Sequence, residues 1–201
     1  MAKFIGDRIS TEDHPKSTTI VITPKRVLWK EIILGLWLAG FTFAGLYVVY
    51  LLFFGGMENL QMGENFDEDI RRQQVIYLAI FTAFWAYFEY VTLKAFLWIV
   101  FGRELIMIDT EALSVKKSIL GYGKSHRFFF ENIKKFRYEK PDSLSLNTFL
   151  DNSYWSTGTE VYKIDHKGKT KSFGRKLEDK DAKLLYRFIG DRMKKWRKAS
   201  S

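Results

Sequence analysis

The chain has 201 residues, a formal net charge of +9, an apolar fraction of 47% and no cysteine. This length fits one or two domains. The absence of cysteine excludes disulfides, thiol catalysis and cysteine-ligated metal centres. The three histidines are scattered through polar stretches, so we expect neither a metal site nor a cofactor.

Charge is distributed unevenly around two almost wholly apolar runs, residues 32–54 and 75–101. Residues 1–31 carry six Lys or Arg against four Asp or Glu, residues 56–74 carry two against five, and residues 102–201 carry twenty-three against thirteen. A basic chain can indicate nucleic-acid binding, but with two apolar runs the positive-inside rule explains the charge more simply. We therefore expect both termini in the cytoplasm, an acidic outer loop and no nucleic-acid partner.

Residues 1–31 predict a cytoplasmic N-terminal segment, whose first part, Met1 to Ser17, is polar and lacks the apolar core of a cleavable signal peptide. Within it, the β-branched run from Ser17 to Thr23 predicts a short strand that ends before Pro24. Whether this strand joins a later sheet is left open by the sequence. A basic collar with Trp29 follows, as expected at the depth of the lipid headgroups.

Residues 32–54 predict the first membrane span, because about 20 apolar residues cross a hydrocarbon core of about 30 Å. Small residues recur along it at three-to-five-residue spacing: Gly35, Ala39, Gly40, Ala44 and Gly45. Such residues let two helix backbones approach closely. The alternative is that glycine and alanine are simply common in membrane helices.

A polar loop at 55–74 precedes the second span, residues 75–101, which runs antiparallel to the first. The acidic cluster of this loop (Glu64, Asp67, Glu68 and Asp69) lacks the spacing of a calcium-binding loop and is interpreted as solvated. If the outer ends of the spans lie level, Glu89 is level with residues 40–42, near mid-depth. Lys94 lies closer to the cytoplasmic end, where it can extend its amine toward water.

An ionisable residue within a span is costly unless it faces protein or a water cavity. Three interpretations of Glu89 are therefore open. It is protonated or hydrogen-bonded inside the hairpin, for example to Thr42; it faces a polar group of a partner membrane protein; or it belongs to a proton or ion path. The third requires a homo-oligomer, since two helices cannot enclose a pathway.

Residues 102–201 predict an α+β cytoplasmic domain, because period-two segments are followed by an amphipathic helix. The predicted strands are Glu104 to Asp109, Ala112 to Ile119, Ser125 to Phe130, Ile133 to Glu139, Thr159 to Asp165 and Thr170 to Phe173. Residues 140–157 are irregular. The helix begins near Glu178 and carries one apolar stripe: Ala182, Leu185, Phe188, Ile189, Met193 and Trp196. This order suggests a small antiparallel barrel or sandwich capped by the C-terminal helix.

Several short segments resemble those of bacterial two-span membrane proteins with a cytoplasmic pleckstrin-homology-like (PH-like) domain. They are I-T-P-K-R at 22–26, L-W-I-V-F-G-R-E-L at 97–105, K-S-I-L-G-Y-G-K-S at 117–125 and K-T-K-S-F-G-R-K-L at 169–177. The resemblance implies a PH-like fold and a location in the bacterial inner membrane, but no particular activity, since that family is largely uncharacterised.

A PH-like fold raises the possibility of an anionic-ligand site. The basic residues around the second and third predicted strands of the domain are Lys116, Lys117, Lys124, His126 and Arg127. Strand alternation predicts that Lys124 and His126 share a face. Three outcomes are open: a specific headgroup or partner site, general attraction to anionic lipid, or a solvated charged surface.

The sequence contains none of the patterns typical of nucleophile-elbow hydrolases, zinc proteases, P-loop proteins or dinucleotide-binding folds. We therefore expect a non-catalytic, membrane-anchored interaction protein, an accessory or assembly subunit of a larger inner-membrane complex. Its partners would be other membrane-protein subunits and membrane lipids. Two alternatives are a homo-oligomeric transport or channel component that uses Glu89 and Lys94, and an anionic-lipid sensor.

Overall fold

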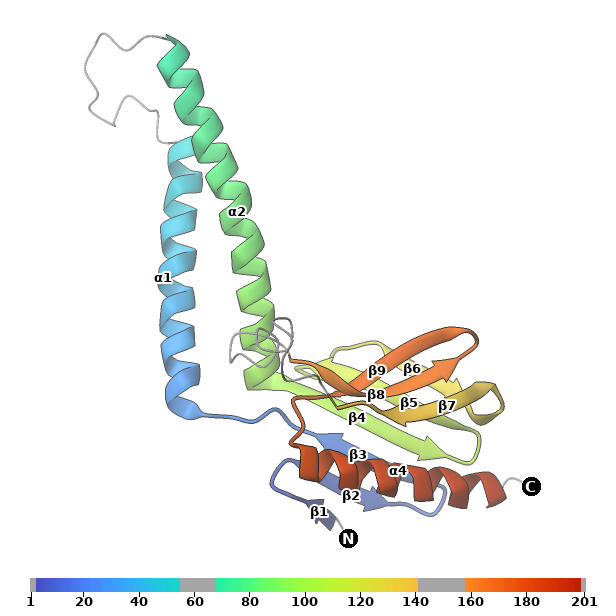
Figure 1. Ribbon diagram of the computed structural model, residues 1–201. Coiled ribbons are helices and arrows are strands. Elements are labelled where there is room, and N and C mark those ends of the chain that lie inside the picture. The colour runs from blue at the N-terminus through green and yellow to red at the C-terminus, as the bar shows by residue number, and fades with distance from the viewer. Residues whose placement is uncertain (1–2, 55–67, 141–157, 200–201) are drawn as a thin grey trace. The chain divides into compact units, whose positions relative to one another are not determined.

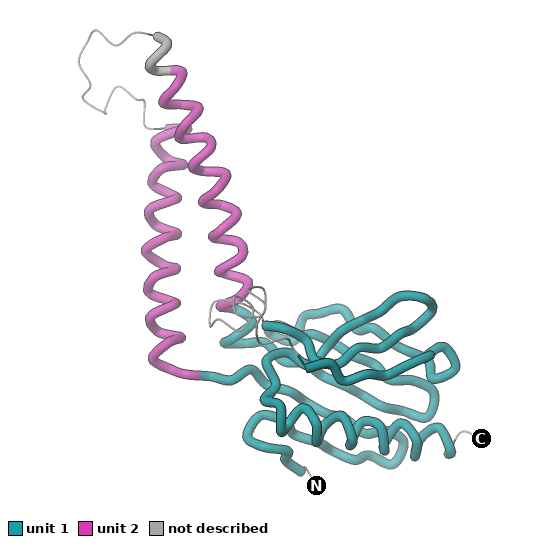
Figure 2. The backbone as a smooth tube through the Cα atoms, viewed as in Figure 1, with its two compact units in different colours: residues 1–26, 97–201 teal, residues 27–96 magenta. Residues whose placement is uncertain are grey.

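The computed structural model describes residues 3–54, 68–140 and 158–199, with the side chains of 68–71 and 199 left out of the description. The chain divides into two compact units (Figure 2). Residues 1–26 and 97–201 form one unit, the β domain, and residues 27–96 form the other, the hairpin. The acidic cluster of the predicted outer loop and the irregular stretch 141–157 lie outside the described residues and side chains.

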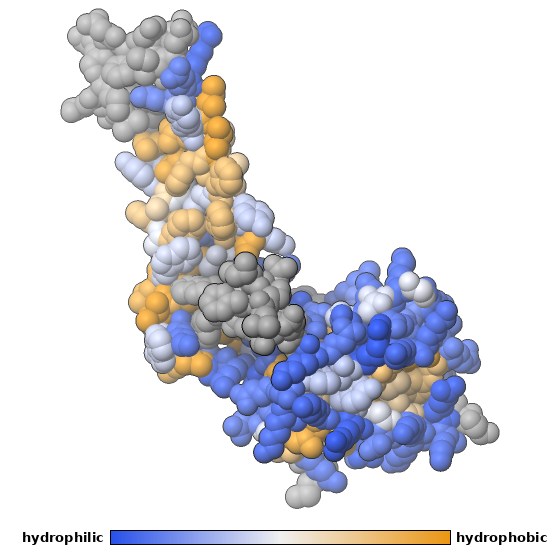
Figure 3. Space-filling model, viewed as in Figure 1, coloured by the Kyte–Doolittle hydropathy of each residue, from blue (hydrophilic) through white to orange (hydrophobic). Residues whose placement is uncertain are grey.

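Two long helices, α1 (Leu28–Phe53) and α2 (Glu68–Phe101), follow the two apolar runs. The helix α2 begins earlier than predicted, because residues 68–74 of the predicted loop contain no glycine or proline and include Glu, Arg and Gln, which favour helix. Both helices are long and apolar enough to cross a membrane. Only 17% of the most apolar window of α1 and none of that of α2 is buried, unlike the core helices of a globular domain. Apolar side chains gather along both helices (Figure 3).

Six antiparallel strands form the first sheet of the β domain, in the order β1-β2-β3-β4-β5-β6 (Figure 1). The strands are β1 (Lys3–Ile5), β2 (Ile9–Asp13), β3 (Ser17–Ile22), β4 (Gly102–Asp109), β5 (Ala112–Ile119) and β6 (Ser125–Phe129). The predicted N-terminal strand therefore joins the later sheet, since β3 pairs with β4 with Ile20 opposite Ile106. The strands β1 and β2 were not predicted, because both are short and lie in a polar segment.

A short 3-10 turn, η2 (Phe130–Asn132), leads into the second sheet, which has the order β7-β8-β9. Its strands are β7 (Ile133–Tyr138), β8 (Glu160–His166) and β9 (Lys169–Arg175). The α+β class with two antiparallel sheets is confirmed. The closed barrel is not seen among the described residues, because β6 and β7 belong to different sheets and neither sheet pairs its own two edges.

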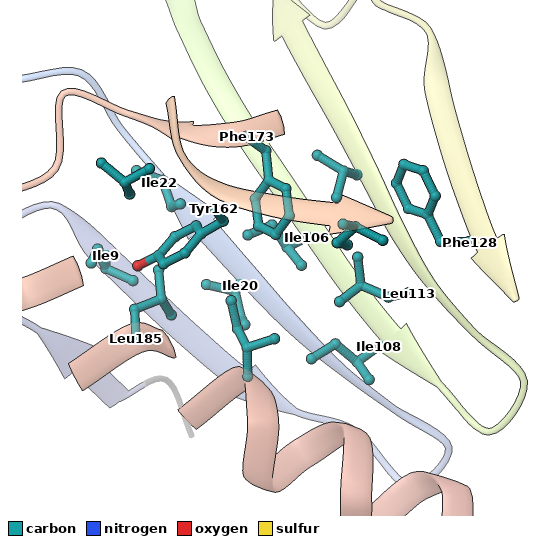
Figure 4. Close-up of a cluster of buried hydrophobic side chains, with 14 of the residues drawn as sticks. Ile9, Ile20, Ile22, Ile106, Ile108, Leu113, Phe128, Tyr162, Phe173 and Leu185 are labelled. Carbon is teal, nitrogen blue, oxygen red and sulfur yellow. The ribbon is translucent and has the colours of Figure 1, made fainter. Parts of the chain in front are cut away.

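The C-terminal helix α4 (Asp179–Ala199) packs against both sheets. Its predicted apolar stripe is confirmed, because Leu185 and Ile189 are fully buried in the core. The Tyr162 hydroxyl of β8 donates to the Ala182 carbonyl at 2.8 Å, and the Trp196 indole donates to the Thr18 hydroxyl of β3 at 3.1 Å. Side chains from both sheets and α4 thus converge in one core (Figure 4).

Candidate functional site

Glu89 of α2 and Thr42 of α1 meet inside the hairpin. The Thr42 hydroxyl lies 2.6 Å from Glu89 Oε1. One helical turn earlier on α2, the Trp85 indole donates to the Phe41 carbonyl at 3.0 Å. These contacts confirm the predicted antiparallel register, which places Glu89 level with residues 40–42. The Thr42–Glu89 contact is also the hydrogen bond inside the hairpin that the first interpretation of Glu89 names.

The Thr42 hydroxyl has a second neighbour, the Leu38 carbonyl of its own helix, at 2.8 Å. The Thr42 hydroxyl therefore lies within hydrogen-bond distance of acceptors on both helices. Glu89 Oε2 is buried and has no hydrogen-bond partner among the described residues. A carboxyl group in this position can therefore hold the two helices in register.

Lys94 does not join this pair. Its amine lies 5.7 Å from the centre of the Tyr90 ring, one turn earlier on α2, and its side chain is exposed. A cation over an aromatic face is favourable. Lys94 therefore interacts with Tyr90 of its own helix, whereas Glu89 contacts Thr42.

The predicted small-residue face of α1 is divided between two sides of the helix. A Cβ atom on Gly45 would lie 1.8 Å from the Trp85 ring, and one on Gly35 would lie 3.5 Å from the Phe96 ring. Ala39, Gly40 and Ala44, in contrast, are exposed. An α-helix turns 100° per residue, so Gly40 points away from the buried Leu38. Only two of the five small residues pack within the hairpin, and a packing role for the others stays a prediction.

Three of the five residues in the predicted basic patch line one cavity of about 400 Å³ between the two sheets. We call it the basic cavity. Its polar lining comes from β5, β8, β9, β6 and the residue just before β6: Lys117, Lys124, His126, Glu160, Thr170, Lys171 and Ser172. Its apolar floor is formed by Val115, Phe128 and Phe173. The Lys171, Thr170 and Ser172 side chains were not predicted, because sequence does not indicate which strand of the second sheet faces β5 and β6.

Lys116 and Arg127, the other two residues of the predicted patch, do not line the basic cavity. The Lys116 amine donates to the Gly121 carbonyl at 3.0 Å, and the Arg127 guanidinium pairs with Asp109 and Glu111 at 3.1 Å each. Successive side chains of a strand point to opposite faces, which separates Lys116 from Lys117.

Within the basic cavity, Lys117 is the one cation that is already paired among the described residues. Its amine lies 2.5 Å from Glu160 Oε1 and 3.0 Å from the Ser172 carbonyl. Lys124, His126 and Lys171 make no hydrogen bond or ion pair with any residue in the described ranges. The arrangement can therefore accept an anionic group without breaking an existing ion pair at these three positions.

Glu104, at the start of β4, is a buried carboxyl group that the sequence reasoning missed. Burial raises its pKa, although hydrogen bonding from the Gly174 amide, at 2.7 Å, opposes this effect. Its Oε1 is buried without a hydrogen-bond partner in the described chain. The strand alternation was the available signal, since Glu104 shares a face with the buried Ile106 and Ile108.

Arg175 connects this region to the end of α2. Its guanidinium lies over the Trp98 ring, 4.8 Å from the centroid, and its Nε donates to Glu160 at 2.8 Å. Glu160 also accepts from Lys117. A continuous series of polar contacts therefore runs from the last turns of α2 to the basic cavity.

No three His, Asp or Glu side chains in the described parts of the chain are arranged as metal ligands. Comparison of the chain with protein-family models, curated proteins and solved structures gives no match.

Proposed function

We propose that this chain is a non-catalytic, membrane-anchored interaction protein, an accessory or assembly subunit of a larger membrane complex. In this proposal α1 and α2 cross the inner membrane of a bacterium, with both termini in the cytoplasm. Two apolar helices and the basic charge of the segments flanking them support this topology. The order of a sheet containing β3–β6, a sheet of β7–β9 and a final helix supports the PH-like resemblance.

The outward face of α1 is the observation that carries the accessory role. Within the hairpin, α1 buries Leu34, Leu38 and Gly45. Gly40 and Ala44 are one turn apart on the exposed side, where a Cβ on Gly40 would meet no atom within 4 Å. Lipid chains need no such flat surface, whereas a second helix packs closely on small residues at this spacing. The outward face thus suits a helix of another membrane subunit.

Crosslinking from single cysteines tests this docking face directly, since the natural chain has none. A photoreactive maleimide on Ala44→Cys should join the chain to a foreign membrane protein in native membranes. The matched probe on Leu46→Cys, which is exposed but farther round the helix, should give much less of that product. Equal products from both positions, or products only with lipid, would contradict a docking face at Gly40 and Ala44.

A second candidate function is the binding of anionic lipid in the basic cavity. Lys124, His126 and Lys171, unpaired among the described residues, support it, as does the apolar floor of the cavity. Each basic residue near an anionic membrane contributes about 1 kcal/mol. We therefore expect the double change of Lys124→Gln and Lys171→Gln to weaken binding of the full-length chain to soluble short-chain phosphatidylglycerol by about thirtyfold.

The control for this experiment removes the same charge outside the cavity, by Lys116→Gln and Lys167→Gln. Under the proposal this control binds almost like the natural chain. Two results together would show that the interaction is only general surface electrostatics. Both double variants would lose the same lipid affinity, and moderate salt would abolish binding by the natural chain.

A further inference from the structure

A second cavity, of about 720 Å³, lies in the β domain beside the end of α2. It is bordered by the turn between β1 and β2, the segment after β3, the start of β4 and the start of α4. Its lining residues adjoin both apolar helices along the chain: Arg26 comes two residues before α1 begins, and Val100 lies in the last turn of α2. We call it the junction cavity.

Charges of both signs line the junction cavity, five from Lys or Arg and three from Asp or Glu. Lys25 and Glu178 pair with each other at 2.9 Å and are both well exposed. Arg103 and Lys180, and likewise Asp7 and Asp181, make no hydrogen bond or ion pair with any residue that the structure describes. The cavity therefore presents unpaired cationic and anionic groups together, which differs from the mostly cationic basic cavity.

Arg8 is the least exposed cation of this group. Its Nε donates to the Thr23 carbonyl at 2.9 Å, and its Nη1 donates to the Lys176 carbonyl at 2.7 Å. These two bonds fix the guanidinium at the cavity without a carboxylate within ion-pair distance in the described chain. Burial lowers the pKa of Arg8, and the negative charges of Glu178 and Asp181 offset this lowering only in part. An anion bound beside Arg8 would compensate this desolvation.

We propose that the junction cavity binds the headgroup of an aminophospholipid. The phosphate would lie against Arg8 and Arg103, and the primary ammonium against Asp7 and Asp181. The inference rests on the membrane-anchored function proposed above, which places the end of α2 at the bilayer surface. Ile99 and Val100, in the last turn of α2, add apolar side chains to the cavity lining, against which the first acyl carbons can pack.

The chemistry of the lining separates this ligand from other phospholipids. A phosphatidylglycerol headgroup offers phosphate but leaves the two carboxylates without a cation. A phosphatidylcholine headgroup carries a cation that cannot donate a hydrogen bond. Phosphatidylethanolamine provides both a phosphate and an ammonium with three donors, so it can satisfy both kinds of group.

Native mass spectrometry of the full-length chain in mild detergent provides the test. The purified chain is offered equal amounts of the three lipids with identical acyl chains. We expect phosphatidylethanolamine to be retained about tenfold more than phosphatidylcholine, as one charge-assisted hydrogen bond allows. Equal retention of these two lipids would overturn the proposal.

Variants assign the selectivity to the cavity. Asp181→Asn should lower retention of phosphatidylethanolamine to that of phosphatidylcholine, whereas Arg103→Gln should lower retention of every phospholipid. The control Lys167→Gln, at the exposed turn between β8 and β9, should change neither retention. The double variant of the basic cavity should leave the preference for phosphatidylethanolamine over phosphatidylcholine unchanged. An unchanged preference in Asp181→Asn would contradict the assignment.

The ligand could come from a lipid headgroup or from a free metabolite. Competition by soluble phosphoethanolamine, which has the same headgroup chemistry, distinguishes these two sources. If it displaces the lipid at equal concentration, the cavity is a site for a free metabolite and the lipid proposal is wrong. The proposed accessory role fails by a different result, the absence of foreign subunits in native membranes. Lipid retention by the purified chain is independent of that result.

Discussion

Glu89 and Glu104 are carboxyl groups in two apolar surroundings, one in the hairpin and one in the core of the β domain. In each, one oxygen has a hydrogen-bond partner, Thr42 for Glu89 and the Gly174 amide for Glu104. The other oxygen is buried and makes no hydrogen bond within the described chain, although Glu104 Oε1 lies 4.0 Å from Arg175 Nε. A buried polar atom without a hydrogen bond costs about 1–3 kcal/mol, so neither position is explained by packing alone.

At Thr42, replacing the hydroxyl with a methyl group should weaken the contact between the helices. We expect Thr42→Val to lower the free energy of unfolding in detergent by about 0.6 kcal/mol, a typical value for hydrogen bonds between membrane helices. Thr82→Val is the matched control, because among the described residues the Thr82 hydroxyl donates to Leu78 of its own helix and to no residue of α1. Glu89→Gln should behave almost like the natural chain, since its amide can still bond to Thr42. Equal losses in the two threonine variants would show that the Thr42–Glu89 contact does not stabilise the hairpin.

Glu104 should make the stability of the β domain depend on pH. Its folded pKa is raised above the ordinary value of 4.5, so the native chain holds a proton that the unfolded chain releases. Its contribution to the free energy of unfolding is fully present below pH 4.5 and is lost as pH rises through the raised pKa.

Glu104→Gln cannot ionise and should remove this part of the pH dependence. Thermal unfolding of the full-length chain between pH 4.5 and pH 8 measures the effect. The exposed control Glu131→Gln should follow the natural profile. If the profile of Glu104→Gln were parallel to that of the natural chain, the buried carboxyl group would not be the cause of the slope.

Among the elements, the two long helices and most strands of the β domain could be predicted, because their apolar periodicity is strong. The antiparallel register of the hairpin also followed from the lengths of the two apolar runs. The side of α1 that faces α2 could not be predicted from small residues alone. The large Trp85 ring decides it, since this ring lies against Gly45.

Gly45 and Gly40 offer a matched pair for testing the packing of α1. A methyl group on Gly45 would overlap the Trp85 ring, so Gly45→Ala should lower the free energy of unfolding by about 1–3 kcal/mol. Gly40→Ala meets no atom within 4 Å and should leave stability unchanged or raise it by up to about 1 kcal/mol, because alanine favours helix. Thermal unfolding in detergent compares them. Equal stability of the two variants would contradict the helix contact.

In the β domain, the limits of prediction lie in contacts distant along the chain. The strands β1 and β2 carry too few apolar residues to stand out from a polar segment. The period of β4 did indicate that Glu104 faces inward, yet its partner at Gly174 is seventy residues away. Likewise, Lys117, Lys124 and His126 were predicted as a basic group, but Lys171 joins them only through the packing of two sheets.

The whole molecule combines a hairpin of two apolar helices with a β domain that contains two charged cavities. The hairpin supplies an outward helix face, the basic cavity can accept an anionic group, and the junction cavity presents both charges beside the end of α2. A homo-oligomeric transport component is the main alternative. It requires Glu89 to face a pathway, whereas Glu89 is bonded to Thr42 within one chain.

Purification of the tagged full-length chain from its native membrane in gentle detergent, followed by native mass measurement, tests the central claim most directly. We expect foreign membrane subunits in fixed stoichiometry with a single copy of this chain. Gly40→Leu, which enlarges the outward face of α1, should release those subunits, whereas Leu46→Ala should retain them. A ring of identical chains with lipid alone would contradict the accessory role and favour transport, and a lone chain would leave lipid binding as its function.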